Sequence, residues 1–271
     1  MNKPAQDALL AENMLEVERL SLQARAWEPD AEIMLDQIGV KPGWQCIDLG
    51  CGPLGILGPL SRRVGPNGHV VGIDLDPRQA AAAYNFIETN HHDNVELLEK
   101  DAYQTGLRAD SFDLTHVRFL FAPVGRSDEL LNEMLRLTRP GGVIAVQEHD
   151  ASSWHCFPTF SAWTRLKETI LEAYDLGGGD FNAGQRTFQM LQRAGLCDVH
   201  IRAAVLALQG QHPYKRLPVQ FAVLLRKRIL DGSLLAEDKL DRLIAECERI
   251  ASDPETIMIS FVVTQVWGYK L

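Results

Sequence analysis

A glycine-rich turn between an apolar run and a short helix constrains this chain more than any other feature. The turn, Gly50-Cys51-Gly52, follows the apolar run 45–48, and a helical pattern begins at residue 57. A second apolar run, 69–74, ends in Asp74. Glycines let a backbone turn sharply near a ligand, and the start of a helix offers free N–H groups to an anion. This order of elements is typical of a site for a ribose-containing nucleotide.

The alternation of apolar and helical segments predicts an α/β fold built on a seven-stranded, mostly parallel sheet. Strands are expected at 45–48, 69–74, 95–99, 112–117, 142–149, 199–208 and 258–267. The spacing of apolar residues predicts helices between them, at 57–64, 77–90, 126–137, 159–175 and 182–194. Alternation of this kind leads to parallel strands joined by crossover helices, with helices on both faces of the sheet.

The chain divides into three predicted regions. Residues 1–40 are expected to form a helical cap segment, because apolar residues recur at helical spacing there. Residues 41–212 and 257–271 are expected to form the nucleotide-binding domain. Residues 213–256 are expected to be a helical insertion, with helices near 218–231 and 236–251, that covers the substrate. The N-terminal helices fit two interpretations: packing at an edge of the sheet, or a lid over a substrate pocket.

The composition limits the kinds of partner that the protein is expected to bind. The 271 residues carry a formal net charge of −9, which argues against nucleic acid as a partner because binding it independently of sequence requires a basic face. The basic runs 215–216 and 226–228 fit a solvated helix face or the capture of an anion. No apolar run has membrane-spanning length, no signal peptide is evident, and the five cysteines lack paired spacing. A cytoplasmic protein without a membrane partner is expected, and a homodimer is left open.

Three features besides the glycine spacing bear on which cofactor the turn binds. The spacing of Gly50, Gly52 and Gly55 also fits the dinucleotide fingerprint, so it does not decide the question alone. Asp48, just before the turn, would repel a phosphate but could help to hold an ammonium group. Asp101-Ala102 follows the third strand, where a carboxylate and a backbone N–H can meet an adenine edge. The expected seventh strand also differs from a dinucleotide fold, which usually carries a second mononucleotide half.

At this point the sequence resembles the class I S-adenosylmethionine-dependent methyltransferases. The residues that carry the resemblance are Asp48-Leu49-Gly50-Cys51-Gly52, Val71-Gly72-Ile73-Asp74, Asp101-Ala102 and Leu137-Thr138-Arg139-Pro140-Gly141-Gly142, over roughly 40–208 and the last strand. The segments 112–119 and 180–186 look like the bacterial small-molecule branch of that family. The resemblance implies a Rossmann-like fold and S-adenosylmethionine as cofactor, with S-adenosylhomocysteine as product. The family usually has a glycine at the position of Leu54; here it comes one residue later, so the turn is expected to differ locally.

The resemblance also implies roles for particular residues. The turn of Gly50, Cys51 and Gly52 would hold the methionine moiety, close to Asp48. Asp74 would bind the ribose hydroxyls, and the residues expected near the adenine are Leu75, Asp101 and Ala102. Arg118 and Phe119, just past the fourth strand, would line the amino-acid end of the cofactor.

The acceptor site is expected past the carboxyl ends of the strands, where open α/β sheets place ligands. His149 is a candidate general base because an ordinary imidazole titrates near neutrality, with Glu148 beside it. Candidate acceptor-binding residues are Tyr103, Asp150, Trp154, Trp163 and Phe221. Each has a structural alternative: hydrogen bonding for His149, capping or ion pairing for the carboxylates, and core packing for the aromatic residues. His116 is expected to face the core.

A metal site is not expected, since His91-His92-Asp93 falls in a surface loop. Methyl transfer is an in-line displacement in which a protein mainly positions the acceptor and excludes water. The predicted function is transfer of a methyl group to O, N or C of a small, fairly apolar organic acceptor. Two alternatives stay open: a non-methylating enzyme on the same fold, for example a cyclase, and a regulatory subunit that binds the cofactor.

Overall fold

The architecture is known from a computed structural model that describes residues 16–124 and 126–271. A seven-stranded sheet lies at its centre, in the order β3-β2-β1-β4-β5-β10-β7. All neighbouring strands run parallel except β10, which is antiparallel to both β5 and β7. The predicted α/β fold is therefore confirmed. The strands are β1 (Gln45–Leu49), β2 (His69–Asp74), β3 (Val95–Glu99), β4 (Phe112–Arg118), β5 (Thr138–Asp150), β7 (Cys197–Ala204) and β10 (Val262–Tyr269).

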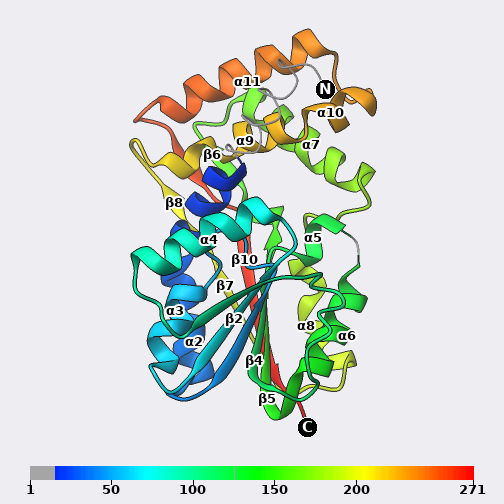
Figure 1. The fold of residues 1–271 in the computed structure, drawn as a ribbon. Helices are drawn as coiled ribbons and strands as arrows, with labels where there is room; N and C mark the ends of the chain where they lie inside the picture. Colours follow the sequence, from blue (N-terminus) through cyan, green and yellow to red (C-terminus); the bar gives the residue numbers. More distant parts are fainter. Residues whose placement is uncertain (1–15, 125) are drawn as a thin grey trace, which may run out of the picture.

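Helices cover both faces of this sheet (Figure 1). On one face, α2 (Glu28–Ile38) and α3 (Leu57–Val64) pack with β1 in a cluster that includes Met34, Leu60 and Cys46. On the other, α6 (Ser127–Leu137) and α8 (Gly184–Arg193) pack in a second cluster. The helices α4 (Pro77–Thr89) and α5 (Phe121–Val124) complete the layers. The central strands β1 and β4 are buried along nearly their whole length, so side chains on both faces of the sheet are covered.

A second group of elements, called here the upper lobe, lies beyond one end of the sheet (Figure 1). Its helices pack around a third hydrophobic cluster that contains Trp163, Leu166, Phe221 and Leu240. A three-stranded sheet with the order β6-β9-β8 belongs to it. The elements are η1 (Ala151–Ser153), β6 (His155–Phe157), α7 (Ser161–Leu176), β8 (Ala207–Leu208), η2 (Pro213–Arg216), α9 (Leu217–Leu224), α10 (Arg226–Asp231), α11 (Glu237–Ser252) and β9 (Ile257–Ile259).

Three predicted elements differ from the structure, and the first two differences have one cause. The strands predicted at 199–208 and 258–267 each divide between the two sheets. Ser260 N–H donates to Leu206 O at 2.9 Å, and Ser260 Oγ accepts from Leu206 N–H. Both predicted strands therefore pass from one sheet to the other at the same place. The helix predicted at 218–231 is interrupted at Leu225, whose ψ is near 0°. The part of the predicted N-terminal helix before residue 16 lies outside the described residues, and 16–26 is helical.

Trp27 links the N-terminal part of the chain to the upper lobe. Its side chain is fully buried, its Nε1–H donates to Tyr214 Oη at 3.0 Å, and its ring stacks on Phe261 with centroids 5.7 Å apart. The substitution Trp27→Phe should lower the free energy of unfolding by about 1 kcal/mol, because the Tyr214 hydroxyl loses its donor. Chemical denaturation of Trp27→Phe, Tyr214→Phe and the double variant measures this coupling; strictly additive effects would contradict it.

No helix within the described part of the chain has the length and apolar character needed to cross a bilayer.

Candidate cofactor and acceptor site

A cavity of about 220 Å³ lies at the carboxyl ends of β1, β2 and β4. This is where an open α/β sheet places its ligand. Seven residues expected at the cofactor line it, namely Asp48, Gly50, Cys51, Gly52, Asp74, Arg118 and Phe119. The wall also contains Gly55, the third glycine of the predicted spacing, together with residues that were not predicted: Leu20, Gln23, Ala24, Pro53, Gln79 and Leu120.

The glycine turn has the backbone that its sequence predicts. Gly50, Gly52 and Gly55 have φ values of 65°, 58° and 51°, a left-handed conformation that residues with a Cβ rarely adopt. The turn is fastened to the end of β2, because Gly52 N–H donates to Asp74 Oδ2 at 2.8 Å. Asp76 N–H donates to the other Asp74 oxygen at 2.9 Å. Burial raises the pKa of Asp74, and these two hydrogen bonds act in the opposite direction.

Asp48 and Arg118 place opposite charges side by side in the cavity wall. Asp48 Oδ1 accepts from His116 Nδ1 at 2.7 Å, and its Oδ2 accepts from Ile56 N–H at 3.0 Å. Arg118 Nη2 donates to Gly55 O at 2.8 Å, whereas its buried Nη1 has no hydrogen-bond partner among the described residues. Burial lowers the pKa of Arg118, and the negative charge of Asp48 partly restores it. A buried donor without a partner requires an explanation, and a ligand carboxylate would provide one.

The helical segment 16–26 lies over this cavity. Leu20, Gln23 and Ala24 project from it into the wall, and Arg19 donates to Gln23 Oε1 at 2.9 Å. At about 220 Å³ the cavity is smaller than a typical ligand pocket of roughly 300–1,000 Å³, and this segment forms part of its wall. The position of 16–26 fits the lid interpretation, whereas α2 packs against the sheet.

Phe119 separates the cavity from a cluster of aromatic side chains under the upper lobe. It stacks on His149 with ring centroids 4.3 Å apart, and His149 stacks on Phe181 at 4.7 Å. Trp154 stacks on Phe181 at 5.4 Å, and Phe221 packs edge-on against both. Phe119 also has a φ of 59°, which is uncommon for a bulky residue and marks backbone strain. Such strain tends to occur at functional sites.

Glu148 and His149 are both buried at the end of β5. Burial raises the pKa of Glu148 to about 8, against hydrogen bonds from backbone N–H groups such as that of Phe121. Burial also lowers the pKa of His149 to about 3, and the positive charge of Arg19 acts in the same direction. Glu148 Oε2 lies 3.5 Å from His149 Nδ1, and neither atom has a hydrogen-bond partner in the described part of the chain. Both pKa shifts favour the uncharged forms of the pair, a carboxylic acid beside a neutral imidazole.

The other predicted site residues lie around these two groups. Leu75 is exposed, Asp101 accepts from Tyr103 N–H at 2.9 Å, and Ala102 is buried; none of the three lines the cavity. Their roles near the adenine stay predictions. Asp150 accepts from Ser152 N–H and from Gln185, so it caps the 3-10 helix that follows β5.

The aromatic candidates fall into two places. Trp154, Trp163 and Phe221 belong to the buried cluster of the upper lobe, where they pack against other rings. Tyr103 lies apart from them under Arg126, whose guanidinium stands 4.1 Å from the ring centre. Its hydroxyl is buried and has no partner among the residues described.

Sequence reasoning missed two further aromatic residues, Phe181 and Phe261. They contact His149 from the connection between α7 and α8 and from the turn before β10. Single aromatic residues far apart in sequence give no pattern that could have identified them.

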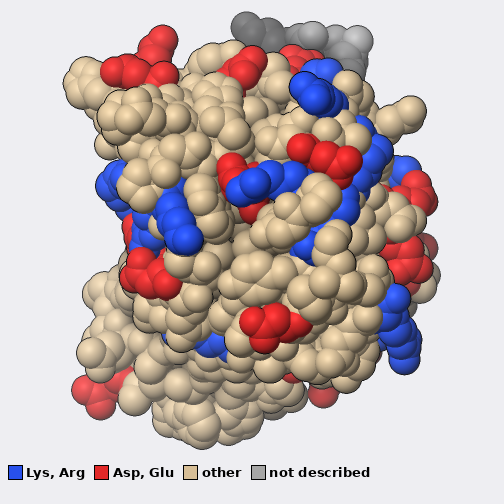
Figure 2. Space-filling model, turned by 90° about the horizontal axis from the view of Figure 1, so that it is seen from below, with Lys and Arg blue, Asp and Glu red and all other residues tan. Residues whose placement is uncertain are grey.

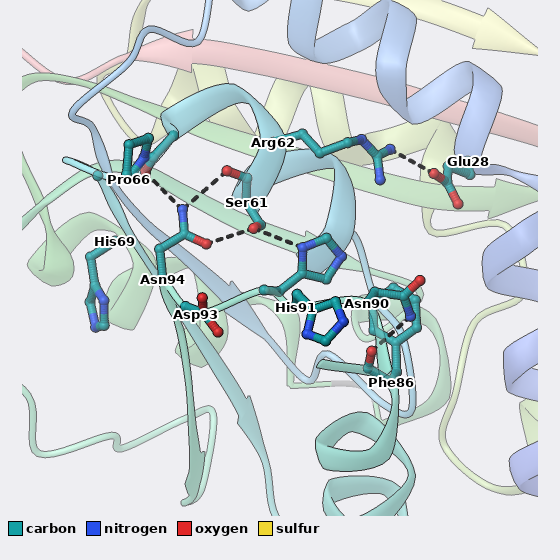
Figure 3. A pocket seen from close by; sticks show the side chains of 13 residues that line it. Glu28, Ser61, Arg62, Pro66, His69, Phe86, Asn90, His91, Asp93 and Asn94 are labelled. Carbon is teal, nitrogen blue, oxygen red and sulfur yellow. Dashed lines mark hydrogen bonds and ion pairs between the residues drawn. The ribbon is translucent and has the colours of Figure 1, made fainter. Parts of the chain in front are cut away.

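A larger hollow of about 930 Å³ lies elsewhere, at the C-terminal end of α3 (Figure 3). Its polar groups satisfy one another: Ser61 Oγ bonds to Asn94 Oδ1 at 2.6 Å, and Asn94 Nδ2 donates to the carbonyls of Ser61 and Gly65. These hydrogen bonds satisfy polar groups at the C-terminal end of α3. Figure 3 shows that the side chains of His69, His91 and Asp93 do not converge on a common point. Within 16–124 and 126–271, no three His, Cys, Asp or Glu side chains are placed to hold a metal ion.

Comparison with known proteins identifies the family. The sequence pattern described as a methyltransferase domain matches residues 40–195, which is more than half of the chain. The ubiquinone/menaquinone biosynthesis C-methyltransferase UbiE of Hahella chejuensis is 30% identical over 187 residues, covering 64% of this chain and 74% of that protein. The demethylmenaquinone methyltransferase of Halalkalibacterium halodurans is 25% identical over 198 residues, covering 66% of this chain and 76% of that protein.

An uncharacterized 37.1 kDa protein of Streptomyces fradiae is 34% identical over 121 residues, but the match spans only 34% of its length. Solved structures share the fold at low identity. The YcgJ protein of Bacillus subtilis superposes with a TM-score of 0.57 at 13% identity, covering 88% of this chain and 97% of that one. A phosphoethanolamine N-methyltransferase of Haemonchus contortus gives a TM-score of 0.53 at 17% identity, covering 89% and 52%.

Proposed function

Because this chain belongs to the class I S-adenosylmethionine-dependent methyltransferases, in the branch that methylates small molecules, we propose that its acceptor is a fairly apolar ring compound. The ring would bind between the cofactor cavity and the aromatic cluster under the upper lobe. The observation that carries this proposal is the place of Phe119, which lines the cavity and also stacks on His149.

The cavity fits the amino-acid end and the ribose of the cofactor. An α-amino acid carries one ammonium and one carboxylate, which match the Asp48 carboxylate and the free Nη1 of Arg118. Each oxygen of Asp74 already accepts one backbone N–H, and a carboxylate has about four acceptor sites, so two sites are left for ribose hydroxyls. We assign Asp48, Arg118 and Asp74 to these roles.

Bound S-adenosylmethionine supplies a methyl group on a positively charged sulfur, which is already activated toward displacement. The chain's own residues then have three tasks. The segment 16–26 and the upper lobe exclude water, Phe119 orients the acceptor ring, and His149 with Glu148 handles any proton that the acceptor loses. His149 is neutral and can accept a proton, and the protonated Glu148 can donate a hydrogen bond to an acceptor oxygen. An imidazole with a pKa near 3 is a weak base, so the acceptor's own acidity would set the rate.

The relatives support a ring acceptor. The names of the two quinone-pathway enzymes above describe methylation of demethylmenaquinone and C-methylation in quinone biosynthesis. Rings of that kind are planar and apolar, which suits a cluster of stacked aromatic side chains. We therefore favour carbon of an electron-rich hydroxylated ring as the methylated atom, with its hydroxyl oxygen as the second candidate.

The test is to incubate the protein with S-adenosylmethionine and a panel of hydroxylated naphthalene and benzene rings. Mass spectrometry should find a product heavier by one CH₂ unit, together with S-adenosylhomocysteine. A product without that gain would favour a cyclase or another non-methylating enzyme. Binding of S-adenosylhomocysteine without any turnover across the panel would favour a regulatory subunit, and no binding at all would reject both the site and the function.

Arg118→Met should weaken binding of S-adenosylhomocysteine roughly tenfold, because one hydrogen bond between charged groups is lost. Calorimetry measures the dissociation constant. Methylthioadenosine is the matched control, since it has the same adenosine and sulfur but no amino-acid end. An equal loss of affinity for both compounds would show that Arg118 shapes the cavity rather than binding the carboxylate.

The remaining expectations concern partners and location. Figure 2 shows acidic and basic side chains intermixed over the face seen there, which supports the prediction, made from the net charge of −9, that nucleic acid is not a partner. The absence of a membrane partner, the cytoplasmic location and a homodimer stay predictions. Size-exclusion chromatography with light scattering would decide the oligomeric state.

A further inference from the structure

A row of buried hydrogen bonds crosses the sheet and ends at Asp48. His116 Nδ1 bonds to Asp48 Oδ1 at 2.7 Å, and Gln147 Nε2 lies 2.9 Å from His116 Nε2. Gln265 Nε2 donates to Gln147 Oε1 at 2.7 Å, and Arg202 Nη1 donates to Gln265 Oε1 at 2.7 Å. The row therefore joins five neighbouring strands, from β1 at the cofactor cavity to β7 at the edge of the sheet.

Strand register explains why these side chains meet. Asp48 pairs with His116 across β1 and β4, while Gln147, Gln265 and Arg202 pair directly across β5, β10 and β7. Residues at paired positions point to the same face of a sheet, here the face that α2 covers. Asp48, His116, Gln147 and Gln265 are all buried, so the bonds are shielded from water.

The direction of every bond in the row is fixed from its outer end. Arginine can only donate, so Gln265 must turn its oxygen toward Arg202. The Gln265 amide nitrogen then donates to Gln147 and also to the carbonyl oxygen of Asp30, at 3.1 Å. Gln147 must in turn present its nitrogen to His116, whose Nε2 can accept only without a proton. His116 is therefore the neutral imidazole with its hydrogen on Nδ1, and it donates that hydrogen to Asp48.

We propose that Gln265, Gln147 and His116 are positioning residues for the cofactor: they keep His116 neutral, so the charge of Asp48 is left for the cofactor's ammonium group. This inference rests on the proposed function for the assignment of Asp48. A cationic His116 would neutralise Asp48 from behind. The carboxylate is also fixed in orientation, because Ile56 N–H holds its second oxygen and its remaining open side faces the cavity.

The substitution Gln265→Glu tests the proposal with almost no change of shape. A carboxylate can only accept, so the new side chain would still bind Arg202 but would turn the nitrogen of Gln147 toward itself. The oxygen of Gln147 would then face His116 Nε2, which must gain a hydrogen. Nitrogen-15 NMR distinguishes the imidazole forms, and the signal of His116 is assigned by its loss in His116→Asn. The wild type should show hydrogen on Nδ1 alone, and Gln265→Glu should show it on Nε2.

Calorimetry with S-adenosylhomocysteine provides the second measurement. Gln265→Glu should weaken binding about tenfold, since one charge interaction at the ammonium group is reduced. Thr115→Val is the matched control, because it removes the buried hydrogen bond to Thr138 Oγ1 at 2.7 Å between β4 and β5, away from the row. Its thermal stability should fall while its affinity stays that of the wild type.

Three results would overturn the proposal. They are a wild-type His116 with hydrogen on Nε2, an unchanged affinity in Gln265→Glu despite the altered imidazole, and an equal loss of affinity in Thr115→Val. If Gln265→Glu fails to fold, the wild-type spectrum still decides the form of His116. A wild type that does not bind S-adenosylhomocysteine would reject the proposed function instead, and the spectrum would still report whether the row is directed as described.

Discussion

The substitution Gly55→Ala should reduce the affinity for S-adenosylhomocysteine by roughly 100-fold or more, which corresponds to about 2.7 kcal/mol. A Cβ added at Gly55 would stand 2.2 Å from Asp48 Oδ2 and 2.9 Å from the carbonyl oxygen of Cys51. No side chain can tolerate such distances, and Gly55 also has a φ of 51°. The turn or the Asp48 carboxylate must therefore move, and both form the cofactor cavity.

Gly65→Ala is the matched control for this effect. Gly65 has a φ of 64°, but a Cβ built there meets no atom within 4 Å. Its ψ of −170° lies in a region that only glycine adopts readily, so this variant should lose stability by about 1–3 kcal/mol through backbone strain, without a change in affinity. Calorimetry and thermal unfolding on both variants separate the two contributions. Wild-type affinity in Gly55→Ala would mean that the turn adapts and that Asp48 is not needed.

The stability of the wild type should fall by about 2 kcal/mol between pH 6.5 and pH 8, because of Glu148. Its folded-state pKa is raised to about 8 from an ordinary value of 4.5, so its contribution is fully present below pH 4.5 and is lost as the pH rises through 8. His149 has a lowered pKa, about 3 against 6.5, so its contribution is lost only as the pH falls below 6.5. Above pH 6.5 only Glu148 of this pair changes its proton between the folded and unfolded states, at about 1.4 kcal/mol per pH unit.

Denaturation curves of Glu148→Gln across this range measure the effect. The variant should lose the pH dependence, since an amide does not titrate, and at pH 8 its stability relative to the wild type should be greater than at pH 6.5. Glu129→Gln is the control: the pKa of exposed Glu129 is lowered by Arg126, so it is ionised throughout and its removal should leave the slope unchanged. If the stabilities of the wild type and Glu148→Gln changed with pH in parallel, the inference that Glu148 has a raised pKa would be wrong.

The strands of the main sheet were predictable from the sequence, because short runs with several apolar residues, such as His69–Asp74, alternate along the chain with segments of helical spacing. The small sheet was not predictable in the same way. Its strands β6, β8 and β9 have two or three residues each, too few for any period to emerge. The positions where two strands change sheet depend on the hydrogen bonds between Ser260 and Leu206, which are 54 residues apart.

The candidate site likewise contains residues that the sequence could predict and residues that it could not. Asp48, the turn and Asp74 lie on local strand–turn–helix sequence, so a short pattern identified them. Gly55, one residue later than the family pattern, also lines the cavity, and its contact with Asp48 gives the shifted glycine a physical reason. Gln147, Gln265 and Arg202 could not be found, since their connection depends on the register between strands β5, β10 and β7.

The place of β10 between β5 and β7 has a consequence for biosynthesis. A ribosome makes β7 well before β10, yet β7 reaches the sheet only through β10. While residues 262–269 are still inside the ribosome, the nascent chain can therefore pair β1 to β5, but the outer edge of β5 has no neighbouring strand. Gln265 is missing from the sheet at that stage. The edge of β5 is therefore the surface that a chaperone would need to protect at that stage.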